Sequence, residues 1–105
     1  MPITITYTNQ DINEYDSFDQ IPNHNLVSII NCSNNQLTSL PDNMNFPNLQ
    51  EFYCSNNKLT LPNNMNFLNL QIFNCHSNKL TTLPDNINFL NLQVFFCSNN
   101  QKPTH

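Results

Sequence analysis

The sequence contains no glycine, tryptophan, alanine or arginine, and only 10% of its 105 residues are charged. Three lysines against seven acidic residues give a formal net charge of -4. Binding to a phosphate backbone requires clustered Lys or Arg, so we expect no nucleic-acid partner. Four of the acids, Asp11, Glu14, Asp16 and Asp19, lie near the N-terminus. That end of the chain is therefore expected to be solvated.

Long apolar runs are also missing. No stretch approaches the roughly 18 apolar residues of a membrane span, so no membrane partner is expected. Residues 1–8 lack both the basic start and the long apolar centre of a secretory signal peptide. The sequence therefore predicts an intracellular protein that is not secreted.

Asparagine is abundant, at 23 of 105 positions. Such a bias is found in disordered or aggregation-prone tracts. The chain is nevertheless 38% hydrophobic, with eight phenylalanines at regular intervals, and disordered chains lack such a supply of large apolar groups. A chain of this length is expected to form one folded domain.

A phrase close to Cys-Ser-Asn-Asn recurs with its cysteines at 32, 54, 75 and 97, in steps of 22, 21 and 22 residues. A fixed period of this length is typical of repeat architectures. Apolar residues recur five and two positions before each cysteine, and asparagine recurs three positions after it. These positions are Val27, Leu49, Leu70 and Leu92; Ile30, Phe52, Phe73 and Phe95; and Asn35, Asn57, Asn78 and Asn100. Leu-Pro pairs follow at 40–41, 61–62 and 83–84.

These residues resemble the leucine-rich repeat family, whose pattern is L-x-x-L-x-L-x-x-N-x-L. The match covers residues 26–101, as three full repeats and a truncated fourth. The resemblance implies an α/β-type leucine-rich repeat solenoid. Such a fold has a short curved parallel sheet on the concave face, irregular or 3-10 convex limbs, and few or no long helices. The repeated Cys-Ser-Asn-Asn motif and the high asparagine content also resemble leucine-rich repeat proteins of giant viruses of amoebae. This resemblance implies a viral protein in the host cytoplasm or virion.

One strand per repeat follows from the spacing. Ile30 and Cys32 are two residues apart, so in a strand they share one face while Asn31 points to the other. Stacked strands then form ladders of buried cysteines and apolar groups. The asparagine that follows is expected to bond the buried turn and the next repeat, because an amide both donates and accepts.

The segments between strands begin with proline and repeat an Asn-x-Asn-Phe phrase. We expect turns or short 3-10 pieces there. The residues predicted to fill the convex side are Met44, Met65, Ile87, Phe46, Phe67 and Phe89. Asparagine tolerates positive φ, so it can turn the corners of a chain that has no glycine.

The two ends depart from the repeat. Residues 1–25 are expected to form an N-terminal capping segment, because residues 3–8 alternate with period two as a strand does. Residues 102–105 form a tail in which Lys102 replaces the expected leucine. The last strand would then present an unpaired edge, which allows a homodimer joined through that edge.

The cysteines are expected to be reduced core thiols, with a disulfide or a metal site as alternatives. Their spacing offers no close C-x₂-C pair for zinc, and parallel neighbouring strands orient sulfurs poorly for a bridge. His76 is expected to be a solvated strand residue rather than a catalytic base. Neither an activated nucleophile nor paired carboxylates are apparent, so we expect no enzyme activity and no cofactor.

The residues between the buried positions form an outward row on the strands. The predicted partner-binding residues are Ile29, Asn31, Glu51, Tyr53, Ile72, Asn74, His76, Val94 and Phe96. Open patches rich in aromatic and apolar groups tend to be interaction sites. The alternative is that β-branched residues merely suit strands.

The predicted function is a non-enzymatic protein–protein interaction module that binds an unknown protein through the concave sheet. If the protein is viral, its partners would be host factors. The alternative function is a structural, self-associating unit.

Overall fold

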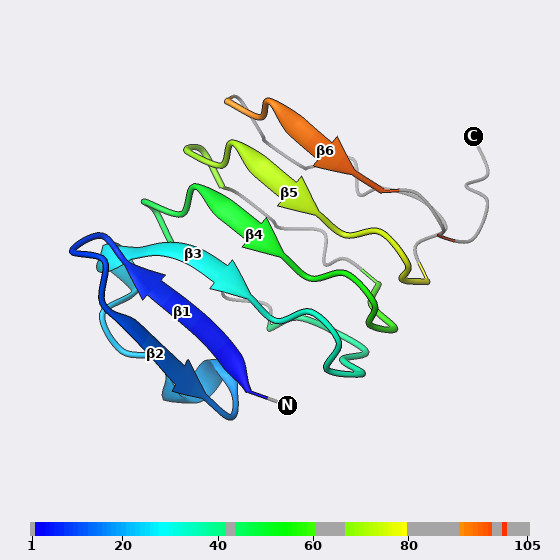
Figure 1. Ribbon diagram of the computed structural model, residues 1–105, viewed down its shortest axis with the longest axis horizontal. Helices are drawn as coiled ribbons and strands as arrows, with labels where there is room; N and C mark the ends of the chain where they lie inside the picture. Colours follow the sequence, from blue (N-terminus) through cyan, green and yellow to red (C-terminus); the bar gives the residue numbers. More distant parts are fainter. Residues whose placement is uncertain (1, 42–43, 61–66, 80–90, 98–99, 101–105) are drawn as a thin grey trace.

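The computed structural model describes residues 2–41, 44–60, 67–79, 91–97 and 100. These residues form six strands and two 3-10 helices, and the described ranges contain no α-helix. In chain order the elements are β1 (Ile3–Tyr7), β2 (Ile12–Tyr15), η1 (Phe18–Gln20), η2 (His24–Leu26), β3 (Val27–Asn31), β4 (Glu51–Tyr53), β5 (Ile72–Asn74) and β6 (Val94–Phe96). Figure 1 shows the six strands side by side in one sheet.

The sheet is mostly parallel. Its strand order is β2-β1-β3-β4-β5-β6, and β3 to β6 are parallel neighbours in register. This confirms the prediction of one short parallel strand for each cysteine phrase. The strand predicted at residues 3–8 is β1, but it runs antiparallel to β3, and β2 pairs antiparallel with its other side. The sequence did not predict β2 or these antiparallel pairings.

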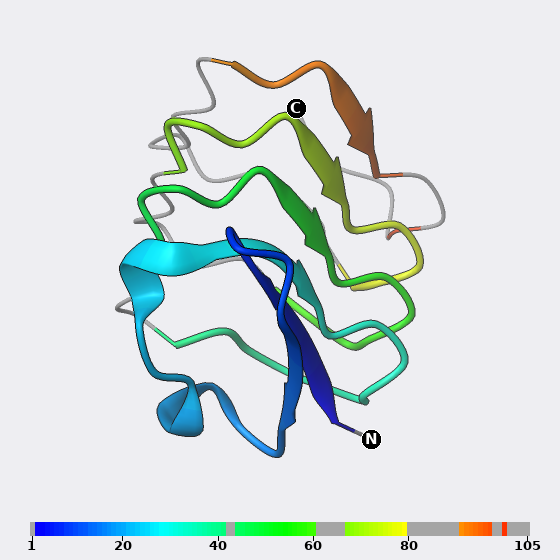
Figure 2. The ribbon, with the colours of Figure 1, turned by 60° about the vertical axis from the view of Figure 1, so that its left-hand side comes forward.

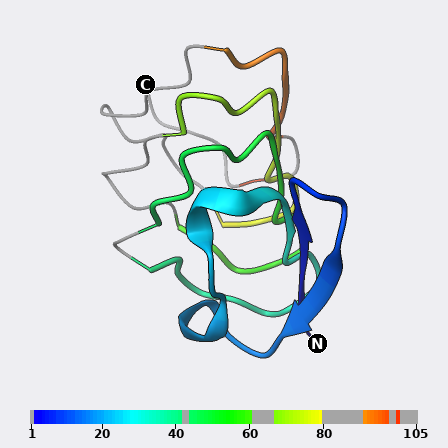
Figure 3. The ribbon, with the colours of Figure 1, turned by 90° about the vertical axis from the view of Figure 1, so that its left-hand side faces the viewer.

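One face of the sheet is covered by the connecting segments. Figure 2 shows β3 to β6 stacked one above another, and Figure 3 shows them along one side of the molecule with the described connecting segments along the other. Met44, Phe46 and Phe67 from these segments are buried, as predicted. Met65, Ile87 and Phe89, which were predicted to fill the same side, lie outside the described residues.

The covered face holds ladders of large apolar side chains. Ile30, Phe52, Phe73 and Phe95 occupy one register position. The rings of Phe52 and Phe73 stack with centroids 5.5 Å apart, and those of Phe73 and Phe95 do the same. Phe67 meets Phe52 edge to face at 5.7 Å. Burial of each such side chain stabilises the fold by roughly 1.5–3 kcal/mol, so the core depends on neighbouring strands covering one another.

The predicted asparagine ladder is present. Asn57 Nδ2 donates to the carbonyl oxygens of Cys32 and Cys54, both at 3.0 Å. Its Oδ1 accepts the backbone N–H groups of Asn35 and Leu37, both at 2.9 Å. Each amide therefore satisfies buried backbone groups of two consecutive turns, which would otherwise cost about 1–3 kcal/mol each.

Asn78 and Asn100 continue the pattern one repeat later. Asn78 Nδ2 donates to Cys54 and Cys75 carbonyls, and its Oδ1 accepts from Leu59 N–H. Asn100 Nδ2 donates to the Cys75 and Cys97 carbonyls. The rungs thus form an unbroken series from the first repeat to the last one described.

A second amide ladder precedes the strands, and the sequence did not predict it. Asn48 Nδ2 donates to Asn25 O at 2.7 Å, Asn69 Nδ2 to Pro47 O at 2.8 Å, and Asn91 Nδ2 to Leu68 O at 2.8 Å. The sequence signal was the phrase Asn-Leu-Gln at 48–50, 69–71 and 91–93. These bonds are exposed, whereas the bonds from Asn57 and Asn78 to the cysteine carbonyls are buried.

Asparagine takes the left-handed backbone conformation in several turns, as predicted. Asn34 and Asn56 have φ of 63° and 56°, in the left-handed region. Ser77 occupies the same position in the next repeat at 58°, so serine can also take this conformation here. The position lies two residues after the cysteine, where the chain leaves the sheet.

The N-terminal segment packs against the first parallel strand. Ile3, Ile5 and Ile21 are buried in the same core as the repeats, and Phe18 is partly buried against it. His24 begins η2, where its ring centroid lies 4.4 Å from that of Phe46. A shift of register between Thr6 and Tyr7 marks a bulge where β1 pairs with β3.

Candidate interaction surface

The predicted partner-binding residues of the four parallel strands form two rows on one face of the sheet. The register places Ile29, Glu51, Ile72 and Val94 in one row and Asn31, Tyr53, Asn74 and Phe96 in the other. Neighbouring members of a row are separated by one strand spacing, about 4.8 Å. We call these eight residues the open face, because they alternate with the buried positions along each strand. His76 lies two residues beyond Asn74 and is half-buried.

The antiparallel hairpin lengthens both rows. Thr6 and Thr4 of β1 pair with Ile29 and Asn31. Ile12 and Glu14 of β2 pair in turn with these threonines. Sequence reasoning did not include these four residues. The threonines could have been found from the alternation of residues 3–8, whereas β2 is almost wholly exposed and lacks a buried alternation.

Large apolar side chains are most exposed on the end strands of the rows. Ile29, Glu51, Tyr53 and Ile72 are half-buried in the centre. At the last strand, Val94 is 36% exposed and Phe96 is 52% exposed. At the opposite end, Ile12 is 65% exposed. Large apolar groups therefore meet solvent at both ends.

A carboxylate and a phenol are bonded at the centre of the open face. Tyr53 Oη donates to Glu51 Oε1 at 2.5 Å. This hydrogen bond, with burial and the nearby negative charge, raises the pKa of Tyr53 to about 12. The protonated phenol donates to one oxygen of the carboxylate and holds it in place.

His76 contacts a hydroxyl but has no further catalytic partner among the described residues. Its Nδ1 lies 3.0 Å from Ser77 Oγ, the next residue along the chain. A catalytic hydroxyl and base usually also have a third group that orients the base. In the described ranges no carboxylate is hydrogen-bonded to His76.

The serine beyond β4 is buried. Ser55 is only 8% exposed and its Oγ donates to Ser33 Oγ at 3.2 Å. Ser33 and Ser55 therefore lie against each other in consecutive turns.

The four cysteines are free thiols. Cys32, Cys54 and Cys75 are fully buried, but Cys97 is exposed, contrary to the expectation of a uniformly buried ladder. No strand lies beyond β6 in the described sheet to cover it. Burial raises the pKa of Cys32 and of Cys75 to about 12, and that of Cys54 well above its ordinary value. The described residues include no group of three or more His, Cys, Asp and Glu side chains arranged to hold a metal ion.

One pocket of about 330 Å³ lies at the hairpin, away from the repeats. Its walls include Tyr7, Tyr15, Asp11 and Leu26. The two phenols are 2.9 Å apart, and Tyr7 Oη also donates to Pro22 O at 3.1 Å. Both hydroxyls are thus already bonded within the protein.

Comparisons with protein-family models, with curated proteins and with solved structures yield no match for this chain. Within the described residues, no helix has the length and apolar character needed to cross a membrane. The candidate site therefore has to be interpreted from its own residues.

Proposed function

We propose that this protein is a non-enzymatic protein–protein interaction module that binds its partner through the open face. The single observation that supports this most directly is the pair of continuous rows, in which aromatic and aliphatic groups are available on strands whose other face is fully packed. Interfaces are enriched in aromatic residues, and Tyr53 and Phe96 place two of them on this surface.

The proposal includes the fold. We infer an α/β-type leucine-rich repeat solenoid, in which the open face is the concave one. The parallel register, the 21–22-residue period and the buried asparagine rungs support this inference. By its resemblance to proteins of giant viruses of amoebae, we extend the proposal to a viral protein acting on host-cell proteins in the host cytoplasm.

The test is affinity capture from amoebal lysate with a double variant, Tyr53→Ser and Phe96→Ser. Both side chains are on the open face and neither belongs to the fully buried core, so the variant is expected to fold and to lose the captured partner. A variant with Leu68→Ser is the matched control, because Leu68 is 43% exposed and lies outside the strands. Undiminished capture by the folded double variant would refute the site.

A second candidate is a self-associating structural unit. Among the described residues β6 is the last strand of the sheet, and its Phe96 is 52% exposed. Open strand edges pair readily with other chains. Sedimentation across a dilution series tests this candidate, because a monomer at every concentration would count against it.

A further inference from the structure

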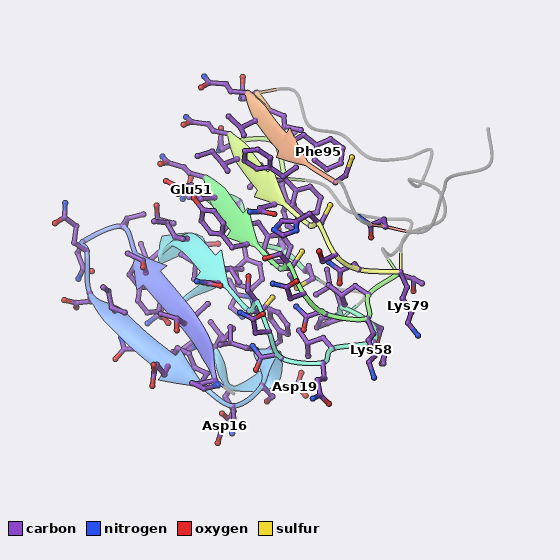
Figure 4. All side chains as sticks on the ribbon, turned by 45° about the vertical axis from the view of Figure 1, so that its right-hand side comes forward. Asp16, Asp19, Glu51, Lys58, Lys79 and Phe95 are labelled. Carbon is purple, nitrogen blue, oxygen red and sulfur yellow. The ribbon has the colours of Figure 1, made fainter. Side chains whose placement is uncertain are left out.

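Glu51 has an unusual setting at the centre of the open face. In its row it stands between Ile29 and Ile72, and all three side chains are half-buried. A carboxylate between two aliphatic groups loses part of its hydration, so a partner that replaces this water gains affinity. Figure 4 shows Glu51 at the start of β4.

The carboxylate has unused capacity for hydrogen bonds. Tyr53 Oη takes one acceptor site on Oε1, and an ionised carboxylate offers about four. In the described part of the chain Glu51 has no ion-pair partner. Lys58 and Lys79 are exposed and extend beyond the other ends of the strands, away from Glu51 (Figure 4).

The surroundings favour a planar cation. The ring of Tyr53 is next to the carboxylate, and Phe96 lies two strands further along the same row. A guanidinium pairs with a carboxylate through two parallel hydrogen bonds and stacks on aromatic faces. It is also less strongly hydrated than an ammonium group, so it enters a partly apolar site at a lower cost.

We propose that Glu51 and Tyr53 form the recognition site for an arginine side chain of the partner protein, with apolar partner residues lying over Ile72, Val94 and Phe96. This inference rests on the proposed function and specifies the chemistry of its partner. A second copy of this chain cannot supply the side chain, because the sequence contains no arginine. The occupant is therefore a different protein.

The experiment is a selection of short random peptides displayed on phage against the immobilised full chain. We expect the bound peptides to be enriched in arginine next to Leu, Ile, Val or Phe. The strongest peptide is then synthesised in three forms, with arginine, lysine or the neutral isostere citrulline. Citrulline should weaken binding by about tenfold or more, since bonds to a charged group are the strong ones. Lysine should be intermediate.

The protein variants give the matching evidence. Glu51→Gln keeps an acceptor for Tyr53 but removes the charge. It should weaken binding of the arginine peptide by about tenfold and leave binding of the citrulline peptide unchanged. Asp19→Asn removes the same charge at an exposed position in η1, and it should have no effect. Thermal unfolding confirms that both variants are folded.

Three results would overturn the inference. In the first, the selected peptides lack arginine and bind the Glu51→Gln variant as well as the original protein, but lose binding to the double variant Tyr53→Ser and Phe96→Ser. The arginine site is then wrong, while the proposed function stands. If no peptide depends on the open face, the proposed function fails with it. If sedimentation shows a dimer whose formation excludes the peptides, the face is occupied by a second copy.

Discussion

The two faces of the sheet are built on the same strands but differ in how strictly they repeat. The buried face presents a large apolar group at the same register position on each parallel strand, namely Ile30, Phe52, Phe73 and Phe95. The open face changes class from strand to strand, as in Asn31, Tyr53, Asn74 and Phe96. Packing constrains every turn in the same way, whereas recognition uses particular positions. Variation along a row therefore points to function, and uniformity points to stability.

The largest expected loss of stability comes from replacing a large side chain on the buried face by alanine. Phe52→Ala should lower the free energy of unfolding by about 3–5 kcal/mol, because Phe52 is fully buried between Phe67 and Phe73 and leaves a cavity. Tyr53→Ala, the adjacent residue on the open face, should cost far less. Urea unfolding of both variants measures the difference. Equal losses would mean that the two faces are not energetically distinct.

The next largest loss of stability distinguishes the buried amide ladder from the exposed one. Asn57→Ala removes the recorded acceptor of the Asn35 and Leu37 N–H groups, so it should cost roughly 3 kcal/mol at about 1–3 kcal/mol for each. Asn69→Ala removes one exposed bond to Pro47 O and should cost only about 0.5–1 kcal/mol. The comparison again uses urea unfolding. A loss from Asn69→Ala as large as that from Asn57→Ala would contradict it.

The smallest effect, taken per thiol and per pH unit, concerns the buried thiols at alkaline pH. The ordinary thiol pKa is 9.0, whereas burial raises the pKa of Cys32 and of Cys75 to about 12. The folded state thus retains these protons when the unfolded state releases them. Each thiol's contribution to the free energy of unfolding is fully present below the pKa of the unfolded state. It is lost as pH rises toward and through the pKa of the folded state, by roughly 1 kcal/mol per thiol and pH unit.

Urea unfolding at a series of pH values between these two pKa values measures that loss. Cys32→Ala should reduce the slope, because it removes one of the titrating groups. The exposed Cys97 provides the matched control, since Cys97→Ala removes a thiol that is not buried. A free energy of unfolding that stays constant over this range would show that the thiols are not buried.

Much of the buried face could be predicted from the sequence. The alternation around each cysteine predicts which side chains point inward, and Cys32, Cys54 and Cys75 are indeed fully buried. The asparagine three residues later was expected to bond its own turn and the next repeat, and Asn57 bonds its own turn and the preceding repeat. These predictions succeeded because every repeat has to bury the same apolar positions and bond the same backbone groups of its turn. The leucine-rich repeat solenoid itself stays a prediction.

The features that occur once were harder to predict. The β2 strand has few buried groups, so neither its existence nor its antiparallel pairing leaves an apolar pattern. The bond between Tyr53 and Glu51 depends on side-chain rotamers rather than on spacing. Likewise, the exposure of Cys97 depends on its place at the end of the described sheet, not on its phrase. The role of the nine predicted partner-binding residues stays a prediction, although eight of them share one face in register.

The bridging amides have a consequence for how such a molecule can change length. Each of Asn57 and Asn78 bonds only the turns next to it, so duplication of one 22-residue unit would reproduce every contact at its new boundaries. Gene duplication could then lengthen the protein without redesign, and each added unit would extend the row by one strand spacing of about 4.8 Å. A ligand that follows the row would have to match this fixed increment.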